Sequence, residues 1–305
     1  MRRLSVGRLG AHLSTCAILH PQFRVHVVDN ARVVSEDALS LRAFDRVGRT
    51  GRPTCTVLLA GSARISAFGE HRWLGAGAGL VVAHKQAICM RQEGERYRAV
   101  VLEWEPGSIG DAPASLLTGF TLEAAAARAV AVAADALHPD PGAAARDVPD
   151  VPATIASLLA TLRGAGVPVR ACAPDELVHE VPPRMAEVAQ ALDEVLSLGS
   201  VRPTTVDLEE RLGLSARQLN RLVEAFHVAY GFNSQGWRDT VNRRRILLGA
   251  ALMTAAGATV VEVATAIGFS SAEAFARALG DAGLPPPSSI ASEVEQLGAA
   301  HAEGA

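Results

Sequence analysis

Four polar side chains in one short segment have the types and spacing that base recognition in DNA requires: Arg217, Gln218, Asn220 and Arg221. A guanidinium can donate two hydrogen bonds to a guanine edge, and a carboxamide can pair in the same way with adenine. The apolar residues of the segment recur at i, i+3, i+4 and i+7: Leu219, Leu222, Val223 and Phe226. This pattern predicts an amphipathic helix with its polar side chains on the face opposite the core.

The alternative is an ordinary solvent-facing helix, because such a helix carries similar side chains. Gln218 also has two possible roles, since it can complete a helix cap or reach a base. The neighbouring elements therefore decide whether this helix is better interpreted as a DNA-contacting helix or as a solvent-facing one.

A turn pattern that occurs twice places this segment in a larger unit. The first copy comprises Thr204–Asp207 and Gly213–Gln218, and the second comprises Thr259–Glu262 and Gly268–Glu273. Each Thr-x-x-acid and each Ser-x-x-Glu/Gln is a capping box, with the second-helix caps expected at Ser215 and Ser270. Each glycine can take the left-handed conformation that ends a helix. The pattern predicts two helix-turn-helix units.

A longer helix, expected from about Gln235 to Thr254, joins the two units. Roughly 20 residues span about 30 Å, close to the roughly 34 Å between successive major grooves. Arg243, Arg244 and Arg245 form a basic cluster that could contact phosphates. The alternative is a solvated face in which at least one of the three forms a salt bridge within the domain.

The two units differ in charge. Between residues 202 and 245 basic side chains outnumber acidic ones, whereas from residue 255 onward Arg277 is the only Arg or Lys among several acidic residues. Affinity for DNA depends on neutralising backbone phosphates. We therefore expect the first unit to dominate DNA contact, with Arg277 as the candidate contact of a chiefly structural second unit.

From about residue 23 to 105 the hydrophobic pattern has the short period of β-strands. The expected strands are Phe23–Val28, Cys55–Leu59, Ala63–Phe68 and Tyr97–Trp104. Short strands separated by glycine turns predict a sandwich or barrel. The segments Leu58–Gly61 and Gly69–Gly77 resemble the strand–turn–strand of a cupin barrel.

A barrel of this kind can hold a small molecule in its mouth. Trp73 and Trp104 are the candidate ligand-binding residues, and the alternative is that both are core residues. His71 and His84 stand apart without a His-x-His, so neither a metal site nor another cofactor is expected. No nucleophile elbow or phosphate-binding glycine loop occurs either, so the chain is not expected to be an enzyme.

Composition narrows the class of protein further. The formal net charge is −3 over 305 residues, so the chain as a whole has no electrostatic signature of nucleic-acid or membrane binding. The cysteines, Cys16, Cys55, Cys89 and Cys172, are widely spaced without a CxxC, which suits a reducing compartment. No signal peptide or apolar run long enough to span a membrane is found. We expect a cytoplasmic protein with no membrane partner.

These patterns predict an α+β fold in which a cupin-like β-barrel with packed helices precedes an all-α double helix-turn-helix domain. Residues 1–170 form the first domain, with alanine-rich helices near 121–137 and 152–163. A proline-rich linker is expected at 171–183, the DNA-binding domain at 184–290 and a tail at 291–305. A helix from Arg184 to about Leu198 should open the second domain.

Residues 208–283 resemble the C-terminal domain of the AraC/XylS family of bacterial transcription regulators. The matching residues are Leu212-Gly213-Leu214-Ser215, Leu219, Arg221, Arg245, Leu252-Met253, Ile267-Gly268-Phe269-Ser270-Ser271, Phe275 and Arg277. The resemblance implies binding to double-stranded DNA, an N-terminal domain for a small-molecule effector and for homodimer formation, and contact with RNA polymerase if the protein is an activator.

The sequence also departs from the family pattern. Val223 and Leu279 stand where aromatic residues are usual, Asn233-Ser234 replaces Ser-Pro, and Gly280 interrupts the last helix. These departures leave open an interaction or regulatory protein whose helical domain no longer binds DNA. A cupin-type enzyme fused to a helical domain is a third possibility that lacks the expected metal ligands.

Overall fold

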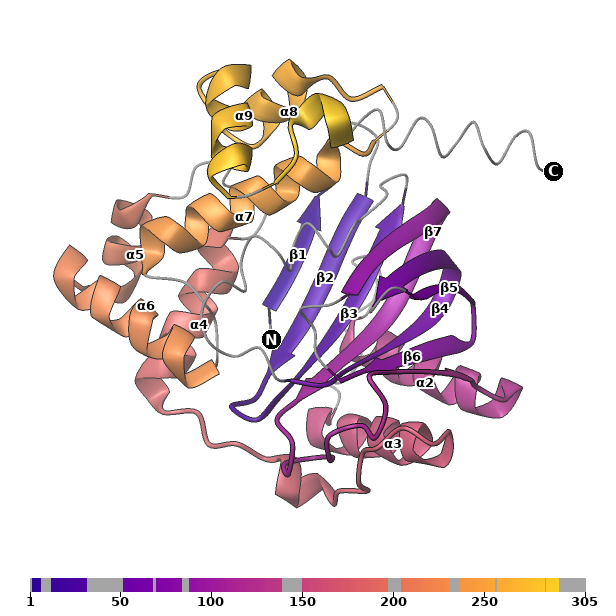
Figure 1. Ribbon diagram of the computed structural model, residues 1–305. Coiled ribbons are helices and arrows are strands. Elements are labelled where there is room, and N and C mark those ends of the chain that lie inside the picture. The colour runs from indigo at the N-terminus through magenta and orange to yellow at the C-terminus, as the bar shows by residue number, and fades with distance from the viewer. Residues whose placement is uncertain are drawn as a thin grey trace.

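The structure is a computed structural model that describes residues 2–6, 12–31, 52–67, 70–83, 88–138, 150–196, 204–230, 236–255, 257–282 and 284–290. An antiparallel sheet with two helices packed on it precedes a group of helices at its side (Figure 1). The expected α+β class is therefore confirmed. The expected tail at 291–305 and residues 231–235 lie outside the described residues.

The described strands form one eight-stranded sheet in the order β1-β2-β3-β7-β4-β6-β8, with β5 paired to β4. The strands are β1 (Arg2–Val6), β2 (His12–Leu19), β3 (Phe23–Ala31), β4 (Thr54–Ala67), β5 (Glu70–Gly75), β6 (Ala78–Val82), β7 (Ile88–Trp104) and β8 (Leu117–Thr121). The strands β1 and β2 were not expected from the sequence.

The long pair β4–β7 contains a register shift between Leu58 and Ser62. Gly61 lies at this bulge with φ +82°, and a Cβ there would come within 1.9 Å of the Arg96 carbonyl oxygen. Only glycine accepts both the left-handed backbone and the close approach of the neighbouring strand. The bulge separates the part of β4 that pairs with β6 from the part that pairs with β5.

The main core lies between the sheet and two helices, α2 (Ala124–Leu137) and α3 (Val151–Gly164). Alternate residues of β3 are buried, beginning with Phe23, Val25 and Val27, as the two-residue period of a strand requires. The side chain of Asp150 accepts a hydrogen bond from Ala153 N at 3.1 Å and so caps α3.

The sheet domain extends further along the chain than the expected boundary at residue 170. Cys172 and Leu177 are buried in its core, and Leu177 ends the short 3-10 helix Pro174–Leu177. Of the expected linker at 171–183, only the residues after Leu177 lie between the two cores before α4 (Pro183–Leu196) begins.

The helical domain consists of α4 and five further helices, among the residues that the structure describes. These are α5 (Thr205–Leu212), α6 (Ala216–Tyr230), α7 (Trp237–Leu252), α8 (Val260–Ala266) and α9 (Ala272–Asp281). One core joins α4, α5, α6 and the start of α7, and a second joins the remainder of α7 to α8 and α9. The linking helix α7 thus contributes to both cores, and it runs from α5 and α6 to α8 and α9 (Figure 1).

Gly249 is placed where α7 crosses the second core. A Cβ on Gly249 would lie 2.4 Å from Ile267 and 2.6 Å from the buried ring of Phe275. We predict that Gly249→Ala lowers the free energy of unfolding of the helical domain by about 1–3 kcal/mol, because it overpacks a filled core. Chemical denaturation followed by circular dichroism measures this change.

Gly280→Ala is the matched control, since Gly280 also lies in a helix but a Cβ there would meet nothing within 4 Å. It should stabilise the protein by up to about 1 kcal/mol, because alanine loses less backbone entropy than glycine in a helix. Equal effects from the two substitutions would contradict the packing of α7 described here.

Candidate nucleic-acid interface

The first helix-turn-helix unit begins with the expected capping box. Thr204 Oγ1 accepts a hydrogen bond from Asp207 N at 3.2 Å, and Thr204 N donates to the Asp207 carboxylate at 2.6 Å. The backbone hydrogen bond from Thr204, followed by that of its side chain, lowers the pKa of Asp207. Gly213 ends α5 in the left-handed conformation with φ 61°. These contacts fix the turn that leads into α6.

The N-terminal half of α6 presents Arg217, Gln218, Asn220 and Arg221 as exposed residues. The apolar stripe of the same helix is buried, with Leu219 and Val223 at 0% exposure. This is the division between faces that the apolar spacing predicted. Because the exposed groups lie near the start of the helix, they are placed as in a helix that enters a groove with its N-terminal end.

Gln218 takes part in the cap. Its Oε1 accepts from Ser215 N at 3.1 Å and from Ser215 Oγ at 2.8 Å. Gln218 therefore completes the cap, and its expected contact with a base stays a prediction. Arg217, Asn220 and Arg221 remain as the exposed side chains that could contact bases.

The second helix-turn-helix unit has the same arrangement of capped helices, but the cap of its second helix differs from the expected one. Thr259 and Glu262 form the expected capping box, but α9 is capped by Ser271, whose Oγ accepts from Ala274 N at 3.2 Å. The cap expected at Ser270 is thus shifted by one residue. A Ser-Ser pair offers two possible caps, and the spacing to Glu273 favoured the wrong one. Arg277 is exposed on α9.

The three arginines of α7 have different surroundings. Arg243 Nε forms an ion pair with Asp239 at 2.7 Å across one helical turn. Arg245 donates to the Ile267 carbonyl at 2.8 Å and also to the Gly268 carbonyl, and its guanidinium lies 4.0 Å from the centre of the Phe269 ring. Arg245 therefore holds α7 against the turn of the second unit, and Arg243 belongs to a local ion pair. Arg244 is half-buried on the same helix.

The structure adds a groove that sequence reasoning missed. It lies between the start of α5 and one face of α7, and it is lined by Thr204, Thr205, Trp237, Arg238, Asp239, Val241, Asn242 and Arg245. Arg238 and Asn242 are exposed and lie one helical turn apart on this face. Their four-residue spacing was visible in the sequence, but only the fold shows that the start of α5 lies opposite them.

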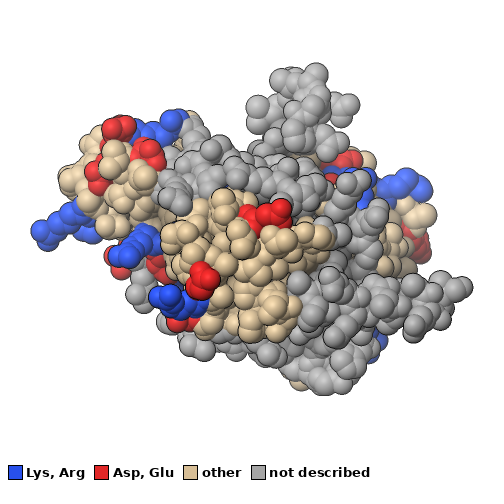
Figure 2. All heavy atoms as spheres, turned by 90° about the horizontal axis from the view of Figure 1, so that it is seen from above, with Lys and Arg blue, Asp and Glu red and all other residues tan. Residues whose placement is uncertain are grey.

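The two units differ in surface charge as expected. Viewed from above, basic and acidic side chains lie together at the left edge, where Figure 1 places α5 and α6, and the centre is largely uncharged with a few acidic groups (Figure 2). Glu262, Glu273 and Asp281 are exposed in the second unit, where Arg277 is the single basic residue between positions 255 and 290.

The two tryptophans proposed as ligand contacts are not brought together. Trp104 is fully buried in the main core, and its Nε1 donates to the Asp111 carbonyl at 3.1 Å. Trp73 is 54% exposed on β5, which pairs with the far part of β4. Trp104 is thus a core residue, which was the stated alternative to lining a pocket. Trp73 lies elsewhere on the sheet.

In the part of the chain that the structure describes, no cluster of three or more His, Cys, Asp or Glu could hold a metal ion. No described helix combines the length and the apolar character that crossing a bilayer requires. His84 lies outside the described residues, as does the side chain of His71.

No family model and no curated protein matches the chain. Among solved structures, the AraC-like transcriptional activator CuxR matches at 14% identity with a TM-score of 0.34, covering 78% of this chain and 79% of that chain. ToxT from Vibrio cholerae matches at 10% identity with a TM-score of 0.34, covering 89% and 98%.

A Cupin_2 domain of an XRE family transcriptional regulator from Enterobacter cloacae matches at 17% identity with a TM-score of 0.22, covering 28% of this chain and 83% of that domain. The matches include regulators of the family whose motifs the sequence resembles. At such TM-scores the likeness carries no argument, so the functional case is made from the site itself.

The role of Arg245 leads to a prediction about the second unit. Arg245→Lys should lower the stability of α8 and α9 by about 1–3 kcal/mol, because a lysine cannot donate two fixed hydrogen bonds and stack on Phe269 at once. Hydrogen exchange of the amides in residues 260–281 measures the loss.

Arg238→Lys is the control for this change. Arg238 lies on the same helix and is exposed, so the same substitution should leave exchange in α8 and α9 unchanged. Unaltered exchange in Arg245→Lys would show that Arg245 does not hold the second unit in place.

Proposed function

We propose that this protein is a sequence-specific DNA-binding transcription regulator. The observation that carries the proposal is the pair of capped helix-turn-helix units joined by α7, the first of which exposes Arg217, Asn220 and Arg221 near the start of its second helix. Guanidinium and carboxamide groups in that position can pair with base edges in the major groove.

The sheet domain is the proposed site of control, by a small molecule or by assembly into a homodimer, and the chain is proposed to have no enzymatic activity. The motif resemblance to the AraC/XylS family adds RNA polymerase as a proposed partner if this protein activates transcription. We infer a cytoplasmic location, where DNA is accessible.

The second candidate is an interaction protein whose helical domain no longer binds DNA. The exposed acidic residues Glu262, Glu273 and Asp281 favour it, because they repel phosphates. The basic face of the first unit opposes it. We therefore propose that the first unit makes most of the DNA contact and that the second unit is chiefly structural.

Paired substitutions test this division of labour on the DNA site that genome-wide mapping of bound fragments returns. Arg221→Ala should weaken binding roughly tenfold or more, because one good base contact is worth about 1–3 kcal/mol. Arg277→Ala should weaken it by no more than about threefold. Gel-shift titration over a series of salt concentrations measures both affinities and their salt dependence.

Each substitution is the control for the other, since Arg221 and Arg277 are both exposed on the second helix of a unit. Equal losses of affinity would contradict the proposal that the first unit makes most of the DNA contact. Absent or sequence-independent binding by the wild-type chain would instead favour the interaction protein.

A further inference from the structure

We propose that the hairpin between β2 and β3 is a latch that holds the C-terminal end of α6. We call α6 the reading helix, because its exposed N-terminal residues are the proposed base contacts. The latch thereby positions the DNA-binding domain on the sheet domain. The effect of the latch on DNA binding rests on the proposed function, whereas the contact between the hairpin and α6 does not depend on that function. The contact joins residues about 200 positions apart in the sequence, Arg24 and Tyr230.

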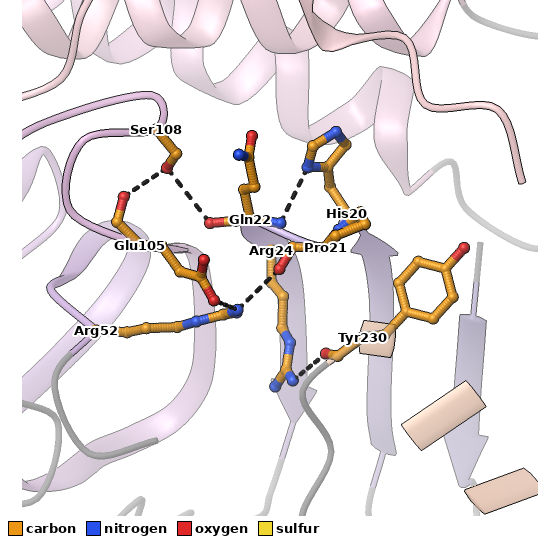
Figure 3. Close-up of polar contacts among 8 residues, drawn as sticks. All are labelled: His20, Pro21, Gln22, Arg24, Arg52, Glu105, Ser108 and Tyr230. Carbon is orange, nitrogen blue, oxygen red and sulfur yellow. Dashed lines mark hydrogen bonds and ion pairs between the residues drawn. The ribbon is translucent and has the colours of Figure 1, made fainter. Parts of the chain in front are cut away.

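The tip of the hairpin is fixed to the rest of the sheet domain (Figure 3). Arg52, whose side chain is 8% exposed, donates to the Pro21 carbonyl at 2.9 Å and to Glu105 at 2.6 Å. Glu105 N donates to the Gln22 carbonyl at 2.8 Å. A charged side chain buried against a backbone carbonyl and a carboxylate is well placed to hold a turn rigid.

Within the turn, Gln22 N donates to His20 Nδ1 at 3.1 Å. Burial, followed by the charge of nearby His179, lowers the pKa of His20 to about 4. His20 is therefore neutral near pH 7, which keeps Nδ1 free to accept this hydrogen bond. The hairpin thus offers a preformed surface rather than a flexible loop.

Arg24, the second residue of β3, donates to the carbonyl of Tyr230, the last residue of α6 (Figure 3). The last carbonyls of a helix have no partner within it, and a cation there is also favoured by the helix dipole. A guanidinium from the sheet domain therefore serves as the C-terminal cap of the helix whose opposite end presents Arg217 and Arg221.

Aromatic rings extend the same contact. The His179 ring lies between the two domains, 5.3 Å from His20 and 6.1 Å from Tyr230, in edge-on arrangements with both. Tyr230 itself is 3% exposed, and Leu19 of β2 packs on the core of α4 and α6. Hairpin, interdomain segment and reading helix thus meet at one place.

The latch leaves the reading face open, because Arg217, Asn220 and Arg221 are all exposed while it is closed. The latch therefore affects the orientation of α6 relative to the sheet domain and does not block DNA from the exposed face of α6. A helix held at a fixed angle loses less freedom on binding DNA than one that moves relative to the sheet domain. An effector that shifts the hairpin would change this orientation.

Hydrogen exchange of the full-length chain tests the latch directly in Arg24→Gln. We expect amides in the last turn of α6, residues 226–230, to exchange roughly tenfold faster, because a charge-assisted contact at the helix end is lost. His179→Ala should raise exchange at the same amides to a smaller extent. Arg24→Lys, which keeps the charge, should lie between Arg24→Gln and the wild type.

Arg98→Gln is the matched control, because Arg98 is a partly buried arginine on the neighbouring strand β7 that pairs with Asp29 and Asp135 of the sheet domain. It should leave residues 226–230 unchanged. Faster exchange at 226–230 in Arg98→Gln as well, or in Arg24→Gln only within residues 12–31, would overturn the latch.

DNA affinity of the same variants separates the latch from the proposed function. Arg24→Gln should weaken binding about three- to tenfold and Arg98→Gln by less than about twofold, since only the first frees the reading helix. Equal affinities of Arg24→Gln and wild type would overturn the positioning role. A wild-type chain that binds no DNA would overturn the proposed function, and the exchange result would still decide the latch.

Discussion

The exposed face of α6 with Arg217, Asn220 and Arg221 depends on the capped turn between α5 and α6. A helix leaves its first four N–H groups without partners, and here Thr204 and Ser215 with their acidic or amide partners satisfy groups at the starts of both helices. Gly213 permits the chain to reverse within a few residues. Because Leu219 and Val223 are buried, Arg217 and Arg221 lie on the exposed face of α6, away from the core.

Features that depend on local chemistry could be predicted from the sequence. The capping boxes, the glycine turn and the spacing of apolar residues act within about four positions, so helices such as α3 and α7 fall within a few residues of their expected ends. The strands β1 and β2 were missed because their pattern is weak and their partners lie in other strands. Ser271 shows the limit even for local signals, since two adjacent serines compete for one cap.

The site was harder to predict because a side chain's role depends on its distant neighbours. Arg243, Arg244 and Arg245 are identical in the sequence pattern, yet one pairs with Asp239 and another binds the carbonyls of Ile267 and Gly268. Trp104 and Trp73 likewise differ only in whether the sheet buries them. Spacing can assign a residue to a face, but its partner is set by the packing of elements far apart in the chain.

The same reasoning explains the asymmetry of the two units and the contact between the domains. The second unit keeps a complete core, with Phe275 and Leu279 at 0% exposure, so its acidic surface does not reflect a loss of fold. It is instead joined to the first unit through α7 and Arg245. The first unit is joined to the sheet domain through Arg24, whose acceptor is a backbone carbonyl that any residue type at position 230 would supply. The helix α6 is therefore held from both sides, and its orientation is set by contacts that lie away from the exposed face with Arg217 and Arg221.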